Sequence, residues 1–244
     1  TPDTITLNSD KPDFVLTHNS PWADYGTLWN VYNHAYTPWE WHEALFNEAK
    51  KIGLEYFSSP FDLTAVDFLQ NLDVCAFKIA SPEINDIPLL KKVSATKKPV
   101  IVSTGIASKE DVDLAVTTLR ETGSEDIILL KCTTAYPTPL KDMNLSSIPM
   151  IRDDYDINVG LSDHSLGIVA PIMAVTMGAV LVEKHIKQAS DDKTVDSDFS
   201  SSEDEFRQMC QAIRETTEAF GEPTYNLAES VKLNFKGGAV FICH

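Results

Sequence analysis

The sequence Gly160-Leu161-Ser162-Asp163-His164-Ser165 closes one short apolar run, and Glu183-Lys184-His185 closes the next. A pattern of helical period lies between these runs, which predicts a strand, a helix and a second strand. Ligands bind at the carboxyl ends of strands in parallel α/β proteins, so His164 and His185 could share one metal ion there. Each histidine could instead be a hydrogen-bonded structural residue, and the pattern alone leaves both interpretations open.

The same alternation of strand and helix runs through most of the chain. It indicates a parallel sheet with right-handed crossovers. The predicted strands cover residues 54–59, 75–79, 100–103, 127–131, 157–160 and 180–183, and the helices that follow them cover 62–71, 87–96, 109–122, 145–152, 168–177 and 203–220. Residues 1–36 show no clean period, and irregular segments of that length are often functional.

One more helix is expected ahead of these units, over residues 38–52. Thr37 is a good N-cap residue, Pro38 suits the first helical position, and Glu40 would complete a capping box. Gly53 is expected to end the helix. We expect Glu40 and His42 to face the solvent.

Six βα units fit either a doubly wound sheet or a (β/α)8 barrel that lacks two strands. No Gly-rich nucleotide loop follows any predicted strand, and nearly every strand ends in a polar residue. Barrel enzymes build their sites from a ring of such strand ends. We therefore predict an α/β fold of the (β/α)8 TIM-barrel class, incomplete here, with about six βα units.

The predicted strand ends are rich in hydroxyl groups. A phosphate could be surrounded by Ser59, Ser81, Ser103, Thr134 and Ser162, with charge from Lys78, although each hydroxyl could instead cap the following helix. Lys78 lies inside an apolar strand, where it must point into something polar or carry a desolvation cost. The same argument applies to Lys131. Glu83 and Asp196 are either acid/base or substrate-hydroxyl partners, or solvated loop carboxylates.

The composition suits a globular α/β protein. The 244 residues are 43% hydrophobic and carry a net charge of −16, which argues against nucleic-acid binding because that function needs a basic surface. The first residues carry no basic start or apolar core, and no apolar run is long enough to span a membrane. Cys75 and Cys132 lie in or beside apolar runs, so we predict that both thiols are buried. The four cysteines are far apart in the sequence, which suggests a reducing compartment. We expect a cytoplasmic protein with no membrane partner.

Six motifs together resemble the sialic acid synthase family, in that family's order and spacing. They are Phe57-Ser58-Ser59-Pro60-Phe61, Phe77-Lys78-Ile79-Ala80-Ser81, Val102-Ser103-Thr104-Gly105, Cys132-Thr133-Thr134-Ala135-Tyr136-Pro137, Gly160-Leu161-Ser162-Asp163-His164-Ser165 and Glu183-Lys184-His185. The resemblance covers about residues 1–222. Within the family, Thr37-Pro38-Trp39-Glu40-Trp41-His42 and Val195-Asp196-Ser197-Asp198-Phe199-Ser200 are most similar to the pseudaminic acid synthases.

The resemblance implies a barrel that condenses phosphoenolpyruvate with an open-chain acetamido sugar, assisted by Mn²⁺ or Mg²⁺. It implies that His164 and His185 bind the metal, and that Glu83 and Asp196 face the sugar. These two histidines and Glu83 would be the catalytic residues. The phosphoenolpyruvate site would be lined by Ser59, Lys78, Ser81, Ser103, Thr134 and Ser162.

The sequence also departs from the family pattern. The family's first two strands have no counterpart here, and residues 223–244 form a tail in place of its antifreeze-like domain, with the apolar run Ala239-Val240-Phe241-Ile242-Cys243 at the end. We therefore expect this chain on its own to be inactive or nearly so, and the full-length protein to be a homodimer. The alternatives are an N-acetylneuraminate or legionaminate synthase that uses another acetamido sugar, and a non-catalytic binding remnant.

Overall fold

Strands and helices alternate along the computed structural model, which describes residues 1–188 and 193–235. In these residues five strands form one parallel sheet in the order β1-β2-β3-β4-β5. The strands are β1 Phe77–Ile79, β2 Val100–Ser103, β3 Ile127–Cys132, β4 Asn158–Asp163 and β5 Val182–Lys184. The helices are α1 Leu28–Ala35, α2 Trp39–Lys51, α3 Leu63–Asn71, α4 Ile87–Ser94, α5 Lys109–Glu121, α6 Ser147–Tyr155, α7 Val169–Thr176, α8 Glu203–Phe220 and α9 Glu229–Phe235.

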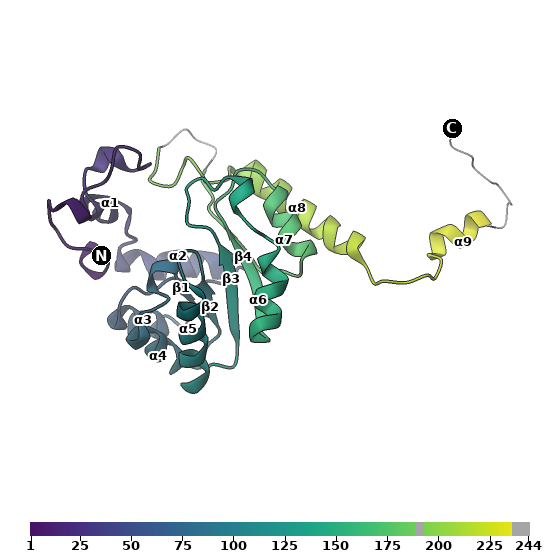
Figure 1. Ribbon diagram of the computed structural model, residues 1–244, viewed down its shortest axis with the longest axis horizontal. Helices are drawn as coiled ribbons and strands as arrows, with labels where there is room; N and C mark the ends of the chain where they lie inside the picture. Colours follow the sequence, from purple (N-terminus) through teal and green to yellow (C-terminus); the bar gives the residue numbers. More distant parts are fainter. Residues whose placement is uncertain (189–192, 236–244) are drawn as a thin grey trace.

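The curled sheet lies at the centre of the molecule, and the helices follow the outside of its curve (Figure 1). This half-barrel confirms the α/β fold of the barrel class that the alternation predicts. The start of α5 is fixed by a capping box between Ser108 and Asp111, and that of α8 by one between Ser202 and Glu205. The Asp62 side chain caps α3 by accepting hydrogen bonds from two backbone N–H groups. These caps satisfy donors that a helix start would otherwise leave unpaired.

The two faces of the sheet have different roles because side chains alternate along each strand. On the outer face, Phe77 of β1 is paired with Val100 of β2, which is paired with Ile127 of β3. These residues are buried in a core shared with α3, α4 and α5. Val159 and Leu161 of β4 continue that face into a second core with α6 and α7. The helices therefore cover the outer face.

The inner face changes from apolar to polar toward the carboxyl ends of the strands. A small apolar cluster of Ala76, Ile101 and Leu130 packs there. Closer to the carboxyl ends, the inner face carries one residue from each of the five strands, and these are Lys78, Ser103, Cys132, Ser162 and Glu183. The polar ends of all the strands therefore gather on one edge of the curled sheet, above an apolar floor.

Phe77→Ala is expected to destabilise the fold by about 3–5 kcal/mol, because it removes a large side chain from a core that cannot refill the space. Phe77 is fully buried, whereas Phe220 at the end of α8 is 69% exposed. The matched variant Phe220→Ala should change the stability by less than about 0.5 kcal/mol. Urea denaturation measures both values. Equal losses in the two variants would contradict this placement of the core.

The strand predicted over residues 54–59 is wrong as a full strand. Its only ladder contact in the described chain is a bridge between Ser58 and Phe77, supported by hydrogen bonds from the Cys75 N–H to the Tyr56 carbonyl and from the Lys78 N–H to the Ser58 carbonyl. The segment runs parallel to β1, but it has a paired neighbour on one side only. It still delivers Ser58 and Ser59 to the same edge as the other strand ends.

Four smaller expectations are also wrong. Helix α2 begins at Trp39 with Pro38 at its N-cap, so Thr37 lies one position too early and makes no cap bond. His42 is buried, with its ring edge-on against Phe46 and Phe68. Residues 1–36 contain helix α1, which Thr27 caps. Cys75 is exposed.

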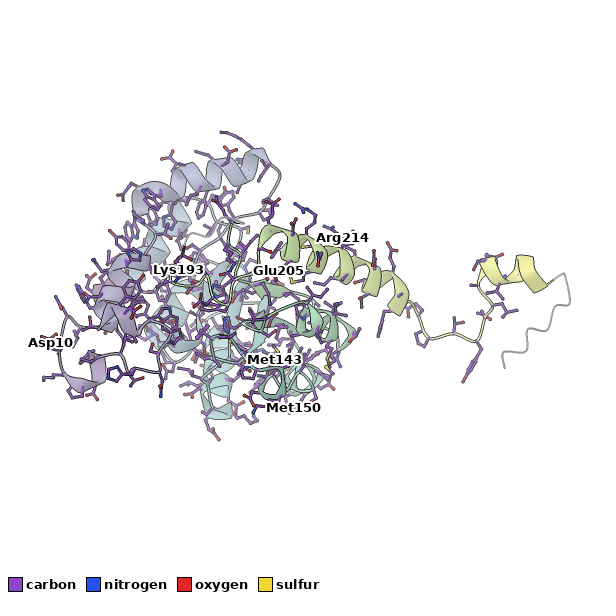
Figure 2. The ribbon with its side chains drawn as sticks, turned by 90° about the horizontal axis from the view of Figure 1, so that it is seen from above. Asp10, Met143, Met150, Lys193, Glu205 and Arg214 are labelled. Carbon is purple, nitrogen blue, oxygen red and sulfur yellow. The ribbon has the colours of Figure 1, made fainter. Side chains whose placement is uncertain are left out.

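The end of the described chain extends away from the sheet. Figure 2 shows α8 running outward past Arg214, and residues 221–232, which lead into α9, are exposed. The apolar run at residues 239–243 lies outside the described residues. Among the helices described, none is both long enough and apolar enough to cross a membrane.

Candidate active site

A pocket of about 320 Å³ opens at the carboxyl ends of the strands, on the inner face of the sheet. Seven of the residues that the sequence singles out line it, and they are Ser59, Lys78, Ser81, Ser103, Ser162, His164 and His185. They come from five segments that are far apart in the sequence. Their convergence follows from the parallel sheet, because all of its strands end at the same edge.

Lys78 supplies a positive charge to this pocket. Its ammonium group donates a hydrogen bond to the Ile79 carbonyl at 3.2 Å and lies 3.4 Å from Glu183 Oε2. The Lys78 side chain is only 8% exposed. A nearly buried ammonium with one carbonyl and one carboxylate partner has bonding capacity left for an anion in the pocket.

Ser103 and Ser162 place hydroxyl groups beside Lys78. Ser162 Oγ donates to Glu183 Oε1 at 2.7 Å, which holds that carboxylate against the pocket wall. Ser103 is 3% exposed, and its Oγ has no hydrogen-bond partner among the described residues. Buried hydroxyls are nearly always satisfied, so this one indicates a polar group that binds in the pocket.

Gly105 is closely surrounded by this part of the pocket. A Cβ at Gly105 would clash with Thr134 Oγ1 and would lie 2.9 Å from Cys132 Sγ and 3.0 Å from Ser81 Oγ. Ser81 Oγ also accepts a hydrogen bond from the Ile106 N–H at 2.8 Å, which ties the loop after β2 to the loop after β1.

Gly105→Ala is therefore expected to displace Ser81 and Thr134 and to weaken anion binding in the pocket at least tenfold. Titration calorimetry with phosphoenolpyruvate measures this loss. The matched variant Gly53→Ala changes a glycine that has no atom within 4 Å of the added Cβ. It should leave the affinity unchanged. Gly53 has a positive φ, so an alanine there is strained, and the variant also controls for a general loss of stability. Equal affinity in wild type and Gly105→Ala would contradict the close packing.

The two histidines lie side by side at the ends of β4 and β5, with ring centroids 5.4 Å apart. His164 Nδ1 is 3.1 Å from the Thr133 carbonyl oxygen, and His185 Nδ1 is 3.3 Å from Asp196 Oδ2. Both acceptors favour a proton on Nδ1, which leaves each Nε2 lone pair available. Burial lowers the pKa of His164, so this imidazole is neutral at physiological pH.

This arrangement fits a divalent metal ion bound by two imidazoles. Metal-binding histidines usually donate their second N–H to a carbonyl or a carboxylate, and both patterns are found here. The described residues contain no group of three or more His, Cys, Asp or Glu side chains that could hold one ion. The chain therefore offers two nitrogen ligands, and the other positions would be taken by water or substrate oxygens.

Three predicted site residues do not line the pocket. Asp196 contacts His185 behind the pocket wall. Thr134 is exposed, with its hydroxyl beside Gly105. Glu83 follows the pocket residue Ser81 on a short 3-10 helix, and its Oε2 is buried without a partner among the described residues. Their roles toward a sugar stay predictions.

Glu83→Gln is expected to stabilise the protein near neutral pH and to have little effect in acid. Burial raises the pKa of Glu83 above its ordinary value of 4.5, so the folded state holds this proton more tightly than the unfolded chain does. Wild-type stability then falls as the pH rises from the ordinary value through the raised one, and glutamine removes that loss. Urea denaturation at about pH 4 and about pH 8 tests the difference. The same gain at both pH values would contradict it.

The sequence analysis assigned no role in the site to six residues of the pocket wall, which are Ala80, Pro82, Cys132, Tyr136, Glu183 and Lys184. A signal for Glu183 was available, because it closes its apolar run two positions before His185 and so shares the face of that histidine. Lys131, which the same reasoning considered, lies on the outer face beside Leu161. Its ammonium donates to the Cys132 carbonyl and to Thr133 Oγ1, away from the pocket.

The irregular N-terminal segment contributes an aromatic wall. Trp22 Nε1 donates to the Val195 carbonyl at 2.8 Å, and the Trp22 ring lies 5.5 Å from that of Tyr136. Tyr136 in turn packs against His164 at 4.5 Å and Phe199 at 4.9 Å. Largely through burial, the pKa of Tyr136 is raised to about 12, so its hydroxyl stays protonated. The wall covers His164, which is buried, whereas the His185 side chain stays 34% exposed.

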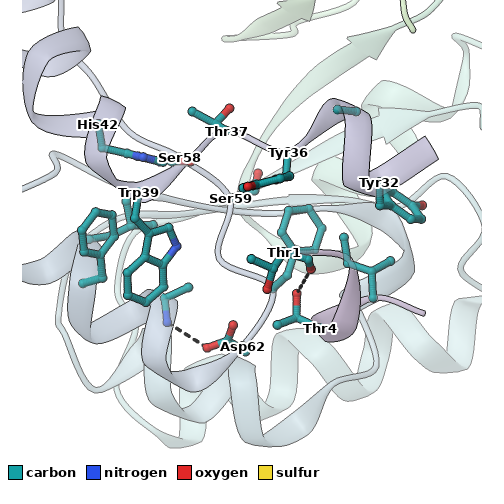
Figure 3. Close-up of a pocket in the computed structure, with 16 residues that line it drawn as sticks. Thr1, Thr4, Tyr32, Tyr36, Thr37, Trp39, His42, Ser58, Ser59 and Asp62 are labelled. Atoms are coloured by element: carbon teal, nitrogen blue, oxygen red, sulfur yellow. Dashed lines mark hydrogen bonds between the residues drawn. The ribbon is translucent and has the colours of Figure 1, made fainter. Parts of the chain in front are cut away.

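A second cavity, of about 300 Å³, lies beside the pocket and shares Ser59 with it. Figure 3 shows Tyr32 and Tyr36 on one side of this cavity and Trp39 and His42 of α2 on the other. Its lining is mainly aromatic and apolar, and it adds the hydroxyl groups of Thr1, Thr4, Thr37 and Ser58 and the carboxylate of Asp62, which caps α3. Lys78, Glu183 and the histidine pair line the first pocket. The chemistry therefore belongs to the pocket at the strand ends.

The parallel α/β half-barrel, with a polar pocket at its strand ends, places this protein in the barrel class of enzymes. Residues 1–225 match the model of the NeuB family. The chain belongs to this family.

Named relatives support that membership. The chain is 43% identical to the pseudaminic acid synthase of Campylobacter jejuni, over 96% of this chain and 68% of the relative. It is 38% identical to the pseudaminic acid synthase of Helicobacter pylori, over 99% of this chain and 71% of the relative. Among solved structures, the N-acetylneuraminic acid (sialic acid) synthetase of Leptospira borgpetersenii, in complex with citrate, superposes with a TM-score of 0.78 at 28% identity. That match covers 86% of this chain and 73% of the solved one.

Proposed function

We propose that the protein condenses phosphoenolpyruvate with an open-chain 2,4-diacetamido-2,4,6-trideoxy hexose to give pseudaminic acid and phosphate. The similarity to two pseudaminic acid synthases supports the substrate class. The observation that carries the proposal is the buried Lys78 ammonium, which shares the pocket with a Ser103 hydroxyl that has no partner in the described part of the chain. A cation and free hydroxyl donors in a half-closed pocket suit the phosphate and carboxylate oxygens of phosphoenolpyruvate.

The proposed reaction forms one carbon–carbon bond and breaks one carbon–oxygen bond. Carbon 3 of phosphoenolpyruvate attacks the aldehyde carbon of the sugar, whose oxygen takes up a proton, and positive charge develops at carbon 2. Water adds at carbon 2 and loses a proton. The resulting tetrahedral intermediate expels phosphate together with the bridging oxygen, which leaves a keto acid.

The residues of the pocket have separate tasks in this scheme. Lys78, Ser81, Ser103 and Ser162 hold the phosphate and the carboxylate, with Ser59 and Thr134 at the rim. Fixed donors of this kind hold the two reactants in line and need no rearrangement as charge develops. Glu83 and Asp196 are the proposed partners of the sugar. Glu83 suits a proton-transfer role because burial raises its pKa toward neutrality.

A divalent ion, Mn²⁺ or Mg²⁺, would be held by His164 and His185. When bound, it supplies a Lewis acid for the aldehyde oxygen. Open positions for water and substrate oxygens suit such an ion. The hydrogen bonds from the two Nδ1 atoms, to the Thr133 carbonyl and to Asp196, set the direction of both rings.

The test compares acetamido sugars as partners of phosphoenolpyruvate in the presence of Mn²⁺. Turnover is measured on the complete product of the gene, and ligand binding on the 244-residue chain. We expect phosphate release and a nine-carbon keto acid with the diacetamido trideoxy hexose, and much slower release with a mono-acetamido hexose that keeps its 6-hydroxyl. Faster turnover with the mono-acetamido sugar would contradict the assigned substrate. Failure to bind phosphoenolpyruvate would contradict the reaction class.

A further inference from the structure

A buried ion pair lies directly behind the two histidines. Asp163 is the last residue of β4 and Lys184 is the last residue of β5, and the two are paired across the sheet. Lys184 Nζ lies 2.6 Å from Asp163 Oδ2, and the two side chains are 1% and 0% exposed. Side chains alternate along a strand, so this pair occupies the outer face while the next residues, His164 and His185, turn toward the pocket.

The pair also holds the turn that follows His164. Lys184 Nζ donates to the Ser165 carbonyl at 2.5 Å and to the Gly167 carbonyl at 3.3 Å. Asp163 Oδ1 accepts from the Ser165 N–H at 2.8 Å. All three protons of the ammonium and both oxygens of the carboxylate therefore have partners. The network ties the ends of two strands and one loop together at a single point.

Stability alone does not account for such a pair. Desolvating two charges costs about as much as their attraction returns, so a buried ion pair adds little net stability over an apolar pair of the same size. What it does contribute is a fixed geometry, because each partner satisfies the other only in one arrangement. The histidine pair lies on the other side of this backbone, together with Ser162 and Glu183.

We propose that Asp163 and Lys184 are positioning residues that fix the ends of β4 and β5 so that His164 and His185 can bind the same divalent ion. The identity of the ion in this inference rests on the proposed function, whereas the position of the two rings does not. Both side chains are buried, so they act on the site through the backbone that carries the two histidines.

The test measures Mn²⁺ binding by electron paramagnetic resonance in Lys184→Met, Asp163→Asn and the double variant, with phosphoenolpyruvate binding measured by calorimetry. Lys184→Met should lower Mn²⁺ affinity about 10- to 100-fold, the range found for groups that orient metal ligands. Phosphoenolpyruvate affinity should fall by less than Mn²⁺ affinity, because Lys78, Ser81 and Ser103 belong to β1, the loop after β1 and β2, and only Ser162 lies on β4. The matched control is Lys98→Met, which breaks a Lys98–Asp73 pair just before β2, at the opposite end of the sheet. It should leave Mn²⁺ affinity unchanged.

The double variant separates positioning from general stability. It leaves no unpaired buried charge, so its thermal stability should recover relative to Lys184→Met, while Mn²⁺ affinity should stay low. Mn²⁺ affinity that recovers together with thermal stability would overturn the inference, since the pair would then be only structural.

A second readout needs no metal. Long-range ¹H–¹⁵N imidazole spectra should show shifted His164 and His185 signals in Lys184→Met and an unshifted signal for the exposed His34. Unchanged spectra for both site histidines would overturn the inference. If wild type binds no Mn²⁺, or if His164→Ala binds it equally well, the metal part of the proposed function fails, and the imidazole spectra still decide the positioning role.

Discussion

Lys78→Met is expected to weaken phosphoenolpyruvate binding by at least about 100-fold, which corresponds to roughly 3 kcal/mol. Methionine keeps the apolar stem of the side chain and removes the ammonium that faces the pocket. The loss has two sources. The anion loses its charged donor, and Glu183, which lies 3.4 Å from Lys78 Nζ, becomes an unopposed negative charge in the same pocket. The protein carries a net charge of −16, so no general attraction compensates.

Titration calorimetry with phosphoenolpyruvate measures this effect. The matched control is Lys131→Met, which makes the same change to a half-buried lysine on the outer face of β3. The control should bind phosphoenolpyruvate as wild type does. If Lys78→Met binds as tightly as the control, the anion does not sit beside Lys78, and the proposed reaction loses its main structural support.

The second large effect is expected at the histidine pair. His164→Ala and His185→Ala should each lower Mn²⁺ affinity by at least about 100-fold, because a site with two protein ligands cannot lose one and still hold the ion well. His164 is buried, so its variant also needs a thermal melting curve to show that it folds. The His185 side chain is 34% exposed, and its variant should fold normally.

Electron paramagnetic resonance of free Mn²⁺ gives both affinities directly. His34→Ala serves as the control, because His34 is exposed on α1 and packs only against Tyr25 among the aromatic residues. It should leave Mn²⁺ binding unchanged. Wild-type affinity in the folded His185→Ala variant would exclude the shared metal site.

The alternation of apolar strands and amphipathic helices was enough to predict most of the sheet and the edge at which the site lies. Strand β2 and helix α8 begin and end where the apolar pattern does. Lys78 was identified by a sound physical argument, because an ammonium inside an apolar strand must face something polar. The structure places it in the pocket, opposite Glu183.

What the sequence could not show depends on register and long-range packing. Periodicity does not reveal which strand residues are paired, so Glu183 and Cys132 were not recognised as neighbours of Ser162. The register also places Lys131 on the outer face of the sheet, although its local sequence resembles that of Lys78. His42 was expected to face the solvent from its helix. It is buried because Phe68, from another helix, packs against it.

The N-terminal segment is the clearest case of a contact that no local pattern predicts. Trp22 is 173 residues from its hydrogen-bond partner Val195, and it completes the wall that covers Tyr136. An irregular segment rich in aromatic residues was the only signal. The role of such a segment depends on which loop it meets, and that is set by the whole fold.

In the proposed reaction, the strand-end pocket joins phosphoenolpyruvate to a sugar and releases phosphate by breaking the carbon–oxygen bond. The most direct measurement uses phosphoenolpyruvate labelled with ¹⁸O in its bridging oxygen, together with the diacetamido trideoxy hexose and Mn²⁺. Mass spectrometry then locates the label after one turnover. We predict that the released phosphate carries the ¹⁸O and that the keto acid product does not. Label retained in the keto acid would show that the phosphorus–oxygen bond breaks instead, and would contradict the account.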